Sequence, residues 1–149
     1  MIYTGSCHCG RLKASFETQK TPEQIGVRTC QCDFCRRHGA VNVSDPDGAA
    51  VIDGVERDMR RYRFALKTAD FLLCRECGVY IAAVTGEGEA IRSTLNVVGL
   101  RMKEFLGVAE APMQYGAEDA ETRVARRAAK WTPTRFTDPE LNASYYGPH

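Results

Sequence analysis

The sequence predicts a mainly β fold, a β-rich α+β arrangement of two antiparallel sheets with helices in the C-terminal third. Three observations support this prediction. Short segments of alternating apolar and polar residues recur before Leu100, turn-forming residues separate them, and a helical period appears only beyond Pro112. Alternation with a period of two is typical of strands buried on one face, and successive short strands with tight connections favour two packed sheets.

The first predicted strand is Arg11 to Phe16, where apolar and polar side chains alternate. Further short strands are expected near residues 25–27, 41–43, 49–52, 62–66 and 70–73. The turn signals DPDG at 45–48 and DG at 53–54 separate some of them. Residues 78–86 and 89–98 are expected to form a hairpin across TGEGE, which completes the run of antiparallel strands.

A helical stripe follows Pro112. Its apolar members are Ala117, Ala120, Val124, Ala128 and Trp131. We expect this helix to end at WTP and to pack on the strands through Trp131. The basic run RVARRAAK at 123–130 shares the helix with acidic residues, so we interpret it as a solvated face and not as a nucleic-acid patch. A last short helix is expected near Asp138, followed by a surface tail, YYGPH.

The overall composition is that of one globular domain spanning residues 1–149. Hydrophobic residues make up 44% and charged residues 26% of the chain. No apolar segment approaches the roughly 18 residues that a membrane span requires, and no signal peptide is recognisable, so we expect a soluble, cytoplasmic protein without a membrane partner. A formal net charge of +1 argues against nucleic acid as a partner. The sequence gives no indication of oligomeric state.

Seven cysteines form three clusters, each with the spacing of metal ligands. They are Cys7 and Cys9 in CHC, Cys30, Cys32 and Cys35 in CQCDFC, and Cys74 and Cys77 in CREC. Side chains at i and i+2 of a strand share a face, so Cys-x-Cys presents two sulfurs in one direction, and Cys-x-x-Cys does the same at a tight turn. Clustered cysteines in a reducing compartment are more often metal ligands or catalytic groups than disulfides.

Seven ligands divide most naturally into four and three. Structural zinc is closed by four protein ligands, whereas catalytic zinc usually has three and one open position. We therefore predict a closed site of Cys7, Cys9, Cys74 and Cys77, and an open, catalytic site of Cys30, Cys32 and Cys35. Gly10 and Gly78 follow the two outer pairs and suit a chain that turns sharply around an ion, because glycine accepts positive φ.

Other interpretations of these residues remain open. The cysteines could be buried as small hydrophobic residues, or CREC could be a redox motif, although no βαβ context surrounds it. His38 lies three positions after Cys35 and could close the second site, which would make the protein a binding module. His8 is expected on the opposite face of its strand, away from the metal, and His149 lies in the tail.

Three segments, GSCHCG, CQCDFCRRHG and CRECGVYIA, resemble the glutathione-dependent formaldehyde-activating enzyme family, which shares its domain with centromere protein V. The resemblance runs from about Tyr3 to Leu100 and leaves residues 112–149 as a C-terminal helical extension. It implies a zinc-binding β-tent of two antiparallel sheets. It also implies that the outer clusters hold a structural zinc and that the middle cluster holds the catalytic zinc, which is the same four-plus-three division.

The family's activity joins glutathione and formaldehyde to give S-hydroxymethylglutathione. The resemblance therefore implies a zinc-dependent enzyme of the carbon–sulfur lyase type, acting on the adduct of a thiol and a small aldehyde. Arg36, Arg37 and Arg75 adjoin the ligands and could offset their charge or bind a substrate carboxylate. The approach YRFALKTADFLLCREC departs from the family pattern, which leaves the identity of the substrate open. The alternative is a non-enzymatic zinc module that binds protein or nucleic acid.

Overall fold

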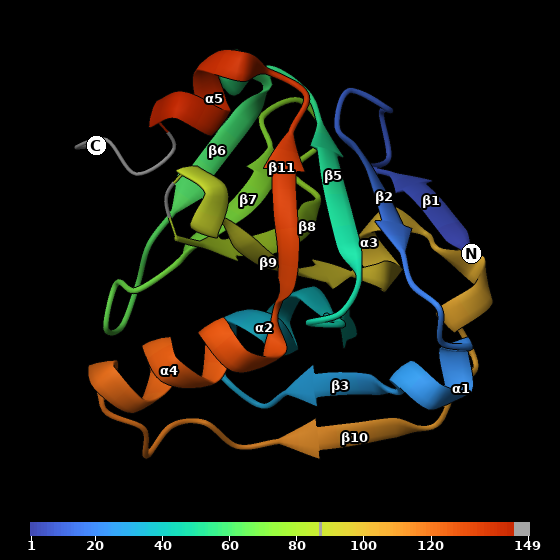
Figure 1. The fold of residues 1–149 in the computed structure, drawn as a ribbon, viewed down its shortest axis with the longest axis vertical. Coiled ribbons are helices and arrows are strands. Elements are labelled where there is room, and N and C mark those ends of the chain that lie inside the picture. Colours follow the sequence, from blue (N-terminus) through green and yellow to red (C-terminus); the bar gives the residue numbers. More distant parts are fainter. Residues whose placement is uncertain (87, 145–149) are drawn as a thin grey trace.

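The described residues, 1–86 and 88–144 of a computed structural model, form a mainly β architecture, as the sequence predicted. Figure 1 shows the strands above and the helices α2 and α4 below them, close to a lower pair of strands. The described strands belong to one mixed sheet of 11 strands. The expected surface tail at 145–149 lies outside the described residues.

The sheet branches at a central strand, β9 (Arg92–Asn96). This strand pairs with β8 (Tyr80–Thr85) on one edge and with β11 (Thr132–Phe136) and then β4 (Asn42–Val43) on the other. Each branch continues outward through further strands. These are β7 (Asp70–Cys74) and β6 (Met59–Tyr62) beyond β8; β5 (Ala49–Asp53), β2 (Lys13–Glu17) and β1 (Ile2–Ser6) beyond β11; and β3 (Val27–Cys30) and β10 (Glu110–Met113) beyond β4.

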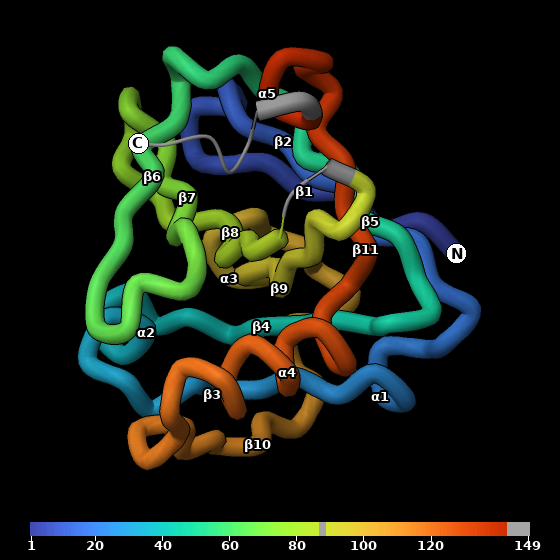
Figure 2. Tube along the Cα trace, turned by 60° about the vertical axis from the view of Figure 1, so that its left-hand side comes forward, coloured from blue at the N-terminus to red at the C-terminus, as the bar shows by residue number. Residues whose placement is uncertain are grey.

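Within residues 1–86 and 88–144, five α-helices connect or cover these strands. They are α1 (Pro22–Ile25), α2 (Asp33–His38), α3 (Val97–Leu100), α4 (Ala120–Lys130) and α5 (Pro139–Ser144), with 3-10 turns at 56–58, 88–90 and 103–105. The two views in Figures 1 and 2 agree that α4 runs beside β3 and β10. The C-terminal segment therefore lies beside β3, the strand that leads into the middle cysteine cluster.

Several local predictions are confirmed. The hairpin of β8 and β9 forms across the expected turn, α4 ends before Trp131, and α5 begins at Pro139. The predicted strand at 62–66 is wrong: β6 ends at Tyr62, and Ala65 and Lys67 adopt positive φ, which interrupts an extended chain.

Pairing among the strands within residues 3–100 is antiparallel, as expected, but the C-terminal segment is not only helical. It also contributes β10 and β11, which pair in parallel with β3 and β5. Each of the two strands contains a proline, Pro112 or Pro133, and prolines lower the strand propensity of a segment. The sequence signal for these strands was correspondingly weak.

Two apolar clusters fill the interior. The larger lies between the two branches of the sheet and includes Phe16, Ile52, Leu95 and Phe136. The smaller gathers Phe71, Tyr80, Ala83 and Trp131 around Cys35, beneath the middle cysteine cluster. Trp131 is 6% exposed, which confirms that it anchors the C-terminal segment.

Candidate metal centres

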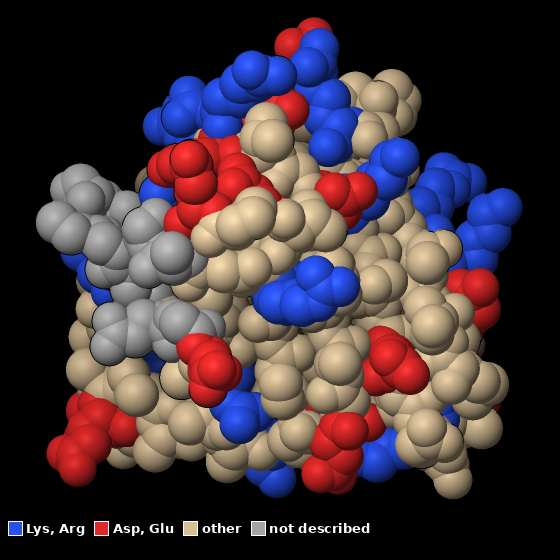
Figure 3. All heavy atoms as spheres, turned by 45° about the horizontal axis from the view of Figure 1, so that its top comes forward, with Lys and Arg blue, Asp and Glu red and all other residues tan. Residues whose placement is uncertain are grey.

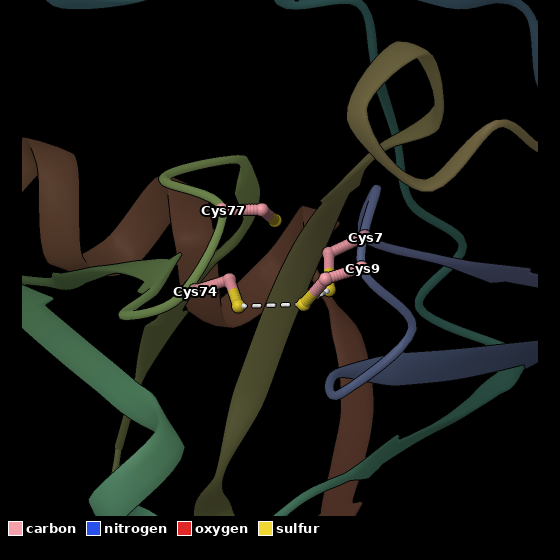
Figure 4. A group of neighbouring side chains, drawn as sticks. All are labelled: Cys7, Cys9, Cys74 and Cys77. Carbon is pink, nitrogen blue, oxygen red and sulfur yellow. Dashed lines mark hydrogen bonds between the residues drawn. The ribbon is translucent and has the colours of Figure 1, made fainter.

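The outer cysteine pairs meet in space. Cys7 and Cys9 lie in the loop after β1, Cys74 ends β7, and Cys77 lies in the turn before β8. Figure 4 shows their side chains directed toward one another from the two segments. All four Sγ atoms lie within 4.8 Å of one another, with 3.7 Å between Cys7 and Cys9 and 3.5 Å between Cys9 and Cys74. This arrangement is compatible with tetrahedral coordination of one ion.

Glycine shapes both segments of this site. Gly10 has φ 86° and Gly78 has φ 77°, the left-handed region expected from the sequence. The Gly10 N–H donates to the Cys7 carbonyl at 3.1 Å, and the Gly78 N–H donates to the Cys74 carbonyl at 2.9 Å. Each pair of sulfurs is thus carried by a tight turn that a glycine closes.

The pKa values of the outer cysteines indicate that all four sulfurs ionise together only with a bound cation. Burial raises the pKa of Cys77, but N–H groups of Cys9 and Val79 donate to its sulfur and lower the pKa to about 6 overall. Burial raises the pKa of Cys74 to about 12. One thiolate therefore forms readily, while burial keeps its neighbour protonated. A divalent ion removes this conflict, and four sulfur donors suit zinc.

The middle cluster is formed at a strand-to-helix junction. Cys30 ends β3, Cys32 is the N-cap of α2, and Cys35 lies in the first turn of that helix. The Cys35 N–H donates to the Cys32 Sγ at 3.4 Å, which fixes the Cys32 side chain. The three Sγ atoms lie within 4.8 Å of one another. The structure thus brings together both groups that the sequence proposed, while metal ligation and catalysis by them remain predictions.

The three sulfurs also share their protons unequally. Thiol donation from Cys30 and Cys35 lowers the pKa of Cys32 to about 2. Donation to its neighbours raises the pKa of Cys35, and donation to Cys32 raises that of Cys30. One sulfur carries the charge and two hold protons, so three thiolates require a cation here as well. Three sulfur donors fit a zinc ion that retains an open position.

The remaining polar residues singled out in the sequence lie apart from these sulfurs. The His38 ring packs against Phe34 and Tyr80, with centroid distances of 4.6 and 5.6 Å, and its nitrogens do not join the sulfur group. His8 is exposed. Arg37 pairs with Asp33 at the surface, the exposed Arg36 lies near it, and Arg75 donates to a backbone carbonyl of β6.

A cavity of about 740 Å³ opens beside the middle cluster. Cys30, Cys32 and Cys35 line it, whereas the outer cysteines do not. Its described charged lining residues are mostly basic: Arg28, Arg123, Arg126, Arg127 and Lys130, with Glu118 as the acidic member. Arg36, Arg37 and Arg75 are absent from the wall. An accessible sulfur cluster in a cationic cavity can receive an anionic small molecule.

Two uncharged polar groups in this wall were missed by the sequence analysis. The Tyr80 hydroxyl and the Asn42 Oδ1 atom are buried and have no hydrogen-bond partner among the described residues. Burial raises the pKa of Tyr80 well above its usual value, and negative charge on the neighbouring sulfur cluster adds to this effect. The phenol therefore retains its proton and can donate it to a bound molecule. A tyrosine in an apolar strand pattern carries no signal of such a role.

The α4 arginines were misinterpreted as a solvated face. Arg127 is 7% exposed, and Arg123 and Arg126 are half-buried in the cavity wall, while Val124 of the expected apolar stripe is 48% exposed. The helix is thus rotated so that charged side chains face inward. A periodicity argument assumes an apolar interior and fails where a helix borders a polar cavity.

The fold and the two sulfur groups define a mainly β protein with two candidate zinc centres, one closed and one bordering a cavity. A family model described as glutathione-dependent formaldehyde-activating enzyme matches residues 2–107, and the chain belongs to this family. Among solved structures, it is similar to a Rhodobacter sphaeroides protein from a structural genomics programme. The identity is 26% and the TM-score 0.55, over 74% of this chain and 99% of that chain. No curated protein matches.

Among the described residues, every helix is too short or too polar to cross a lipid bilayer.

Proposed function

We propose that this chain catalyses the reversible addition of a thiol, glutathione or a similar molecule, to a small aldehyde such as formaldehyde. The reaction is of the carbon–sulfur lyase type when written in the direction of adduct cleavage. The observation that carries the proposal is the opening of the three-sulfur group onto a cavity, which the four-sulfur group does not share. We also propose a reducing compartment such as the cytoplasm, because all seven cysteines are free.

Cys30, Cys32 and Cys35 would hold one zinc ion, and Cys7, Cys9, Cys74 and Cys77 a second, structural one. A zinc ion at the cavity would act as a Lewis acid and lower the pKa of an incoming thiol. In the proposed step, the thiol sulfur attacks the carbonyl carbon, a C–S bond forms, and the C=O electron pair moves to oxygen. The oxygen gains a proton and the thiol loses one, so the addition is balanced.

The Tyr80 hydroxyl is placed to assist at the carbonyl oxygen. It lines the cavity beside the three sulfurs, it is buried, and it is protonated. A donor aimed at an oxygen that becomes negative stabilises the transition state more than the ground state. The aromatic side chains of Phe34 and Phe71, which contact Tyr80, hold the ring in place and exclude water.

The direct test is the rate of adduct formation from glutathione and formaldehyde, followed by NMR exchange spectroscopy with zinc-loaded protein. We expect acceleration over the spontaneous rate and its loss in Cys32→Ser. Asp33→Asn is the matched control, because Asp33 is the next residue and its side chain is 83% exposed. The proposal fails if no thiol in a panel reacts faster with protein and none alters the thiolate-to-metal band of cobalt-substituted protein.

The rival function is a zinc module that binds protein or nucleic acid. It requires two closed sites, and His38 is the residue that could close the second. Its ring contacts are aromatic, so we expect His38→Ala to retain both zinc ions. Loss of one ion in this variant would favour the rival. On the face in Figure 3, acidic and basic side chains are interspersed, which suits a nucleic acid poorly.

A further inference from the structure

Arg28 and Asn42 lie directly opposite each other on β3 and β4, and both line the cavity. Arg28 precedes Cys30 by two positions on the same strand, so the two side chains share a face. Two residues of a strand span about 6.6 Å. A positive charge and an amide therefore lie a short distance along the wall from the three sulfurs.

The Arg28 guanidinium is held in place but has no charge partner. One of its Nη atoms donates to the Ser44 hydroxyl, which in turn donates to the Lys130 carbonyl at 2.9 Å. Among the described residues, Arg28 forms no ion pair, although its side chain is half-buried. Asn42 is 7% exposed. Its buried Oδ1 atom has no partner in the same part of the chain but can only accept, so the Nδ2–H groups are the ones that can donate to a carboxylate.

Helix α4 adds further positive charge to the same cavity. Arg123 and Arg126 both form ion pairs with Glu118. The acidic residue of the described wall is therefore already paired with arginine. Arg127 donates to the Thr68 hydroxyl at 2.7 Å and lies 4.8 Å from the centre of the Trp131 ring. The helix buries this arginine while exposing Val124, an orientation that hydrophobic burial alone would disfavour. Departures of this kind are expected at functional sites.

We infer that Arg28 and Asn42 form a carboxylate subsite, so that the thiol substrate carries a carboxylate on a short chain. The basic residues of α4 strengthen the subsite electrostatically. A guanidinium matches the two oxygens of a carboxylate, and an amide N–H adds a further donor. That the ligand is a thiol rests on the proposed function. The carboxylate contacts of Arg28 and Asn42 do not depend on that function. Helix α4 lies beyond residues 2–107, so the family match does not cover its part of the wall.

The fluorescence of Trp131 can report binding, because this residue is the single tryptophan of the chain and lines the cavity. Its fluorescence, checked by calorimetry, is followed while zinc-loaded protein is titrated with mercaptopropionate, mercaptopropanol, mercaptopropylamine and propionate. We expect mercaptopropionate to bind at least about 10-fold more tightly than the neutral and cationic thiols. Propionate, which has no thiol, should bind weakly and compete with mercaptopropionate.

Two substitutions assign the effect to the subsite. Arg28→Gln should lose the preference for the carboxylate, and Arg28→Lys should keep part of it. Asn42→Asp, which is nearly isosteric, places a carboxylate opposite Arg28 and should abolish propionate binding. Arg60→Gln is the matched control, because Arg60 also lies on a strand, is exposed, and is outside the cavity wall.

The inference is overturned if the three thiols bind equally, or if natively folded Arg28→Gln and Asn42→Asp protein bind mercaptopropionate as the wild type does. Its failure is separable from that of the proposed function. Carboxylate preference without any acceleration of thiol addition supports the subsite and contradicts the function. Acceleration with no difference among the thiols supports the function and contradicts the subsite.

Discussion

The Sγ atoms of Cys9 and Cys74 lie 3.5 Å apart, although 65 positions separate the two residues in the chain. Cys9 belongs to the loop that joins β1 to β2, at one end of the sheet, and Cys74 is the last residue of β7 on another branch. An ion bound between them would close a long loop and join the two branches. Closing a long loop restricts the unfolded chain, so the folded state gains most from such a link.

Replacing one ligand of the four-sulfur group should therefore impair folding. We expect Cys74→Ser to lose one zinc ion per chain and several kcal/mol of unfolding free energy, since structural zinc sites in small domains contribute on the order of 10 kcal/mol. Zinc content by mass spectrometry and thermal unfolding would measure both effects.

The comparison for this variant is Cys30→Ser, which removes a ligand from the group that borders the cavity. It should also lose one zinc ion, but with a smaller fall in unfolding temperature, because Cys30 and Cys35 are only a few residues apart and close a short loop. Equal destabilisation by the two variants, or full zinc content in Cys74→Ser, would contradict the assignment of a closed structural site.

Removal of the Tyr80 hydroxyl should reduce activity without destabilising the fold. The hydroxyl has no partner among the described residues, so Tyr80→Phe deletes a buried polar atom and breaks no internal hydrogen bond. We expect kcat to fall about 100-fold with KM for the thiol little changed, because the lost donor acts mainly in the transition state. Steady-state kinetics and thermal unfolding test this together.

Tyr62→Phe is the control, since Tyr62 belongs to the same aromatic cluster through Phe34 and Phe64 but is 41% exposed and outside the cavity wall. Its kcat should match the wild type. If Tyr80→Phe is equally active but less stable, the hydroxyl has a structural role and the proposed donor is wrong.

The strands and the sulfur groups were accessible from sequence because each depends on local spacing. Alternation predicted β2 and β5, and the Cys-x-Cys and Cys-x-x-Cys spacings predicted which sulfurs would meet. Pairing of the segments 110–113 and 132–136 with distant strands depends on tertiary contacts, and the prolines in both segments conceal it. Spacing could not provide this information.

The cavity wall shows a second limit of prediction from the sequence. Arg28 occupies an ordinary strand position, and its closeness to Asn42 follows from pairing between β3 and β4. Arg127 lies in a helix whose period correctly predicted a helix but pointed to the wrong buried face. Residues that face a ligand do not obey the rule that apolar side chains point inward, so the positions that determine specificity are the ones that patterning misplaces.

Asp45 provides a test of the fold that is independent of the sulfur chemistry. It lies in the predicted DPDG turn, is 2% exposed, and accepts hydrogen bonds from the Thr18 hydroxyl at 2.6 Å and from Lys20 Nζ at 2.7 Å. Burial raises the pKa of Asp45, but these two donors, the Asp47 N–H and the charge of Lys20 together outweigh burial, so the pKa lies below its usual value of 3.8. The ionised carboxylate therefore stabilises the folded state.

The sign of the pH dependence follows from this lowered pKa. The stabilisation is fully present above the unfolded pKa of 3.8 and is lost as the pH falls through the lower folded value. We expect Asp45→Asn to unfold about 1–3 kcal/mol more easily than wild type at neutral pH, and the difference to shrink below pH 3.8. Urea unfolding of both proteins across this range measures the difference, in which acid effects on the sulfur groups cancel. Asp47→Asn is the control, since its side chain is 84% exposed, and it should change stability little at any pH. A constant difference between Asp45→Asn and wild type down to pH 2 would mean that packing, not charge, makes Asp45 important.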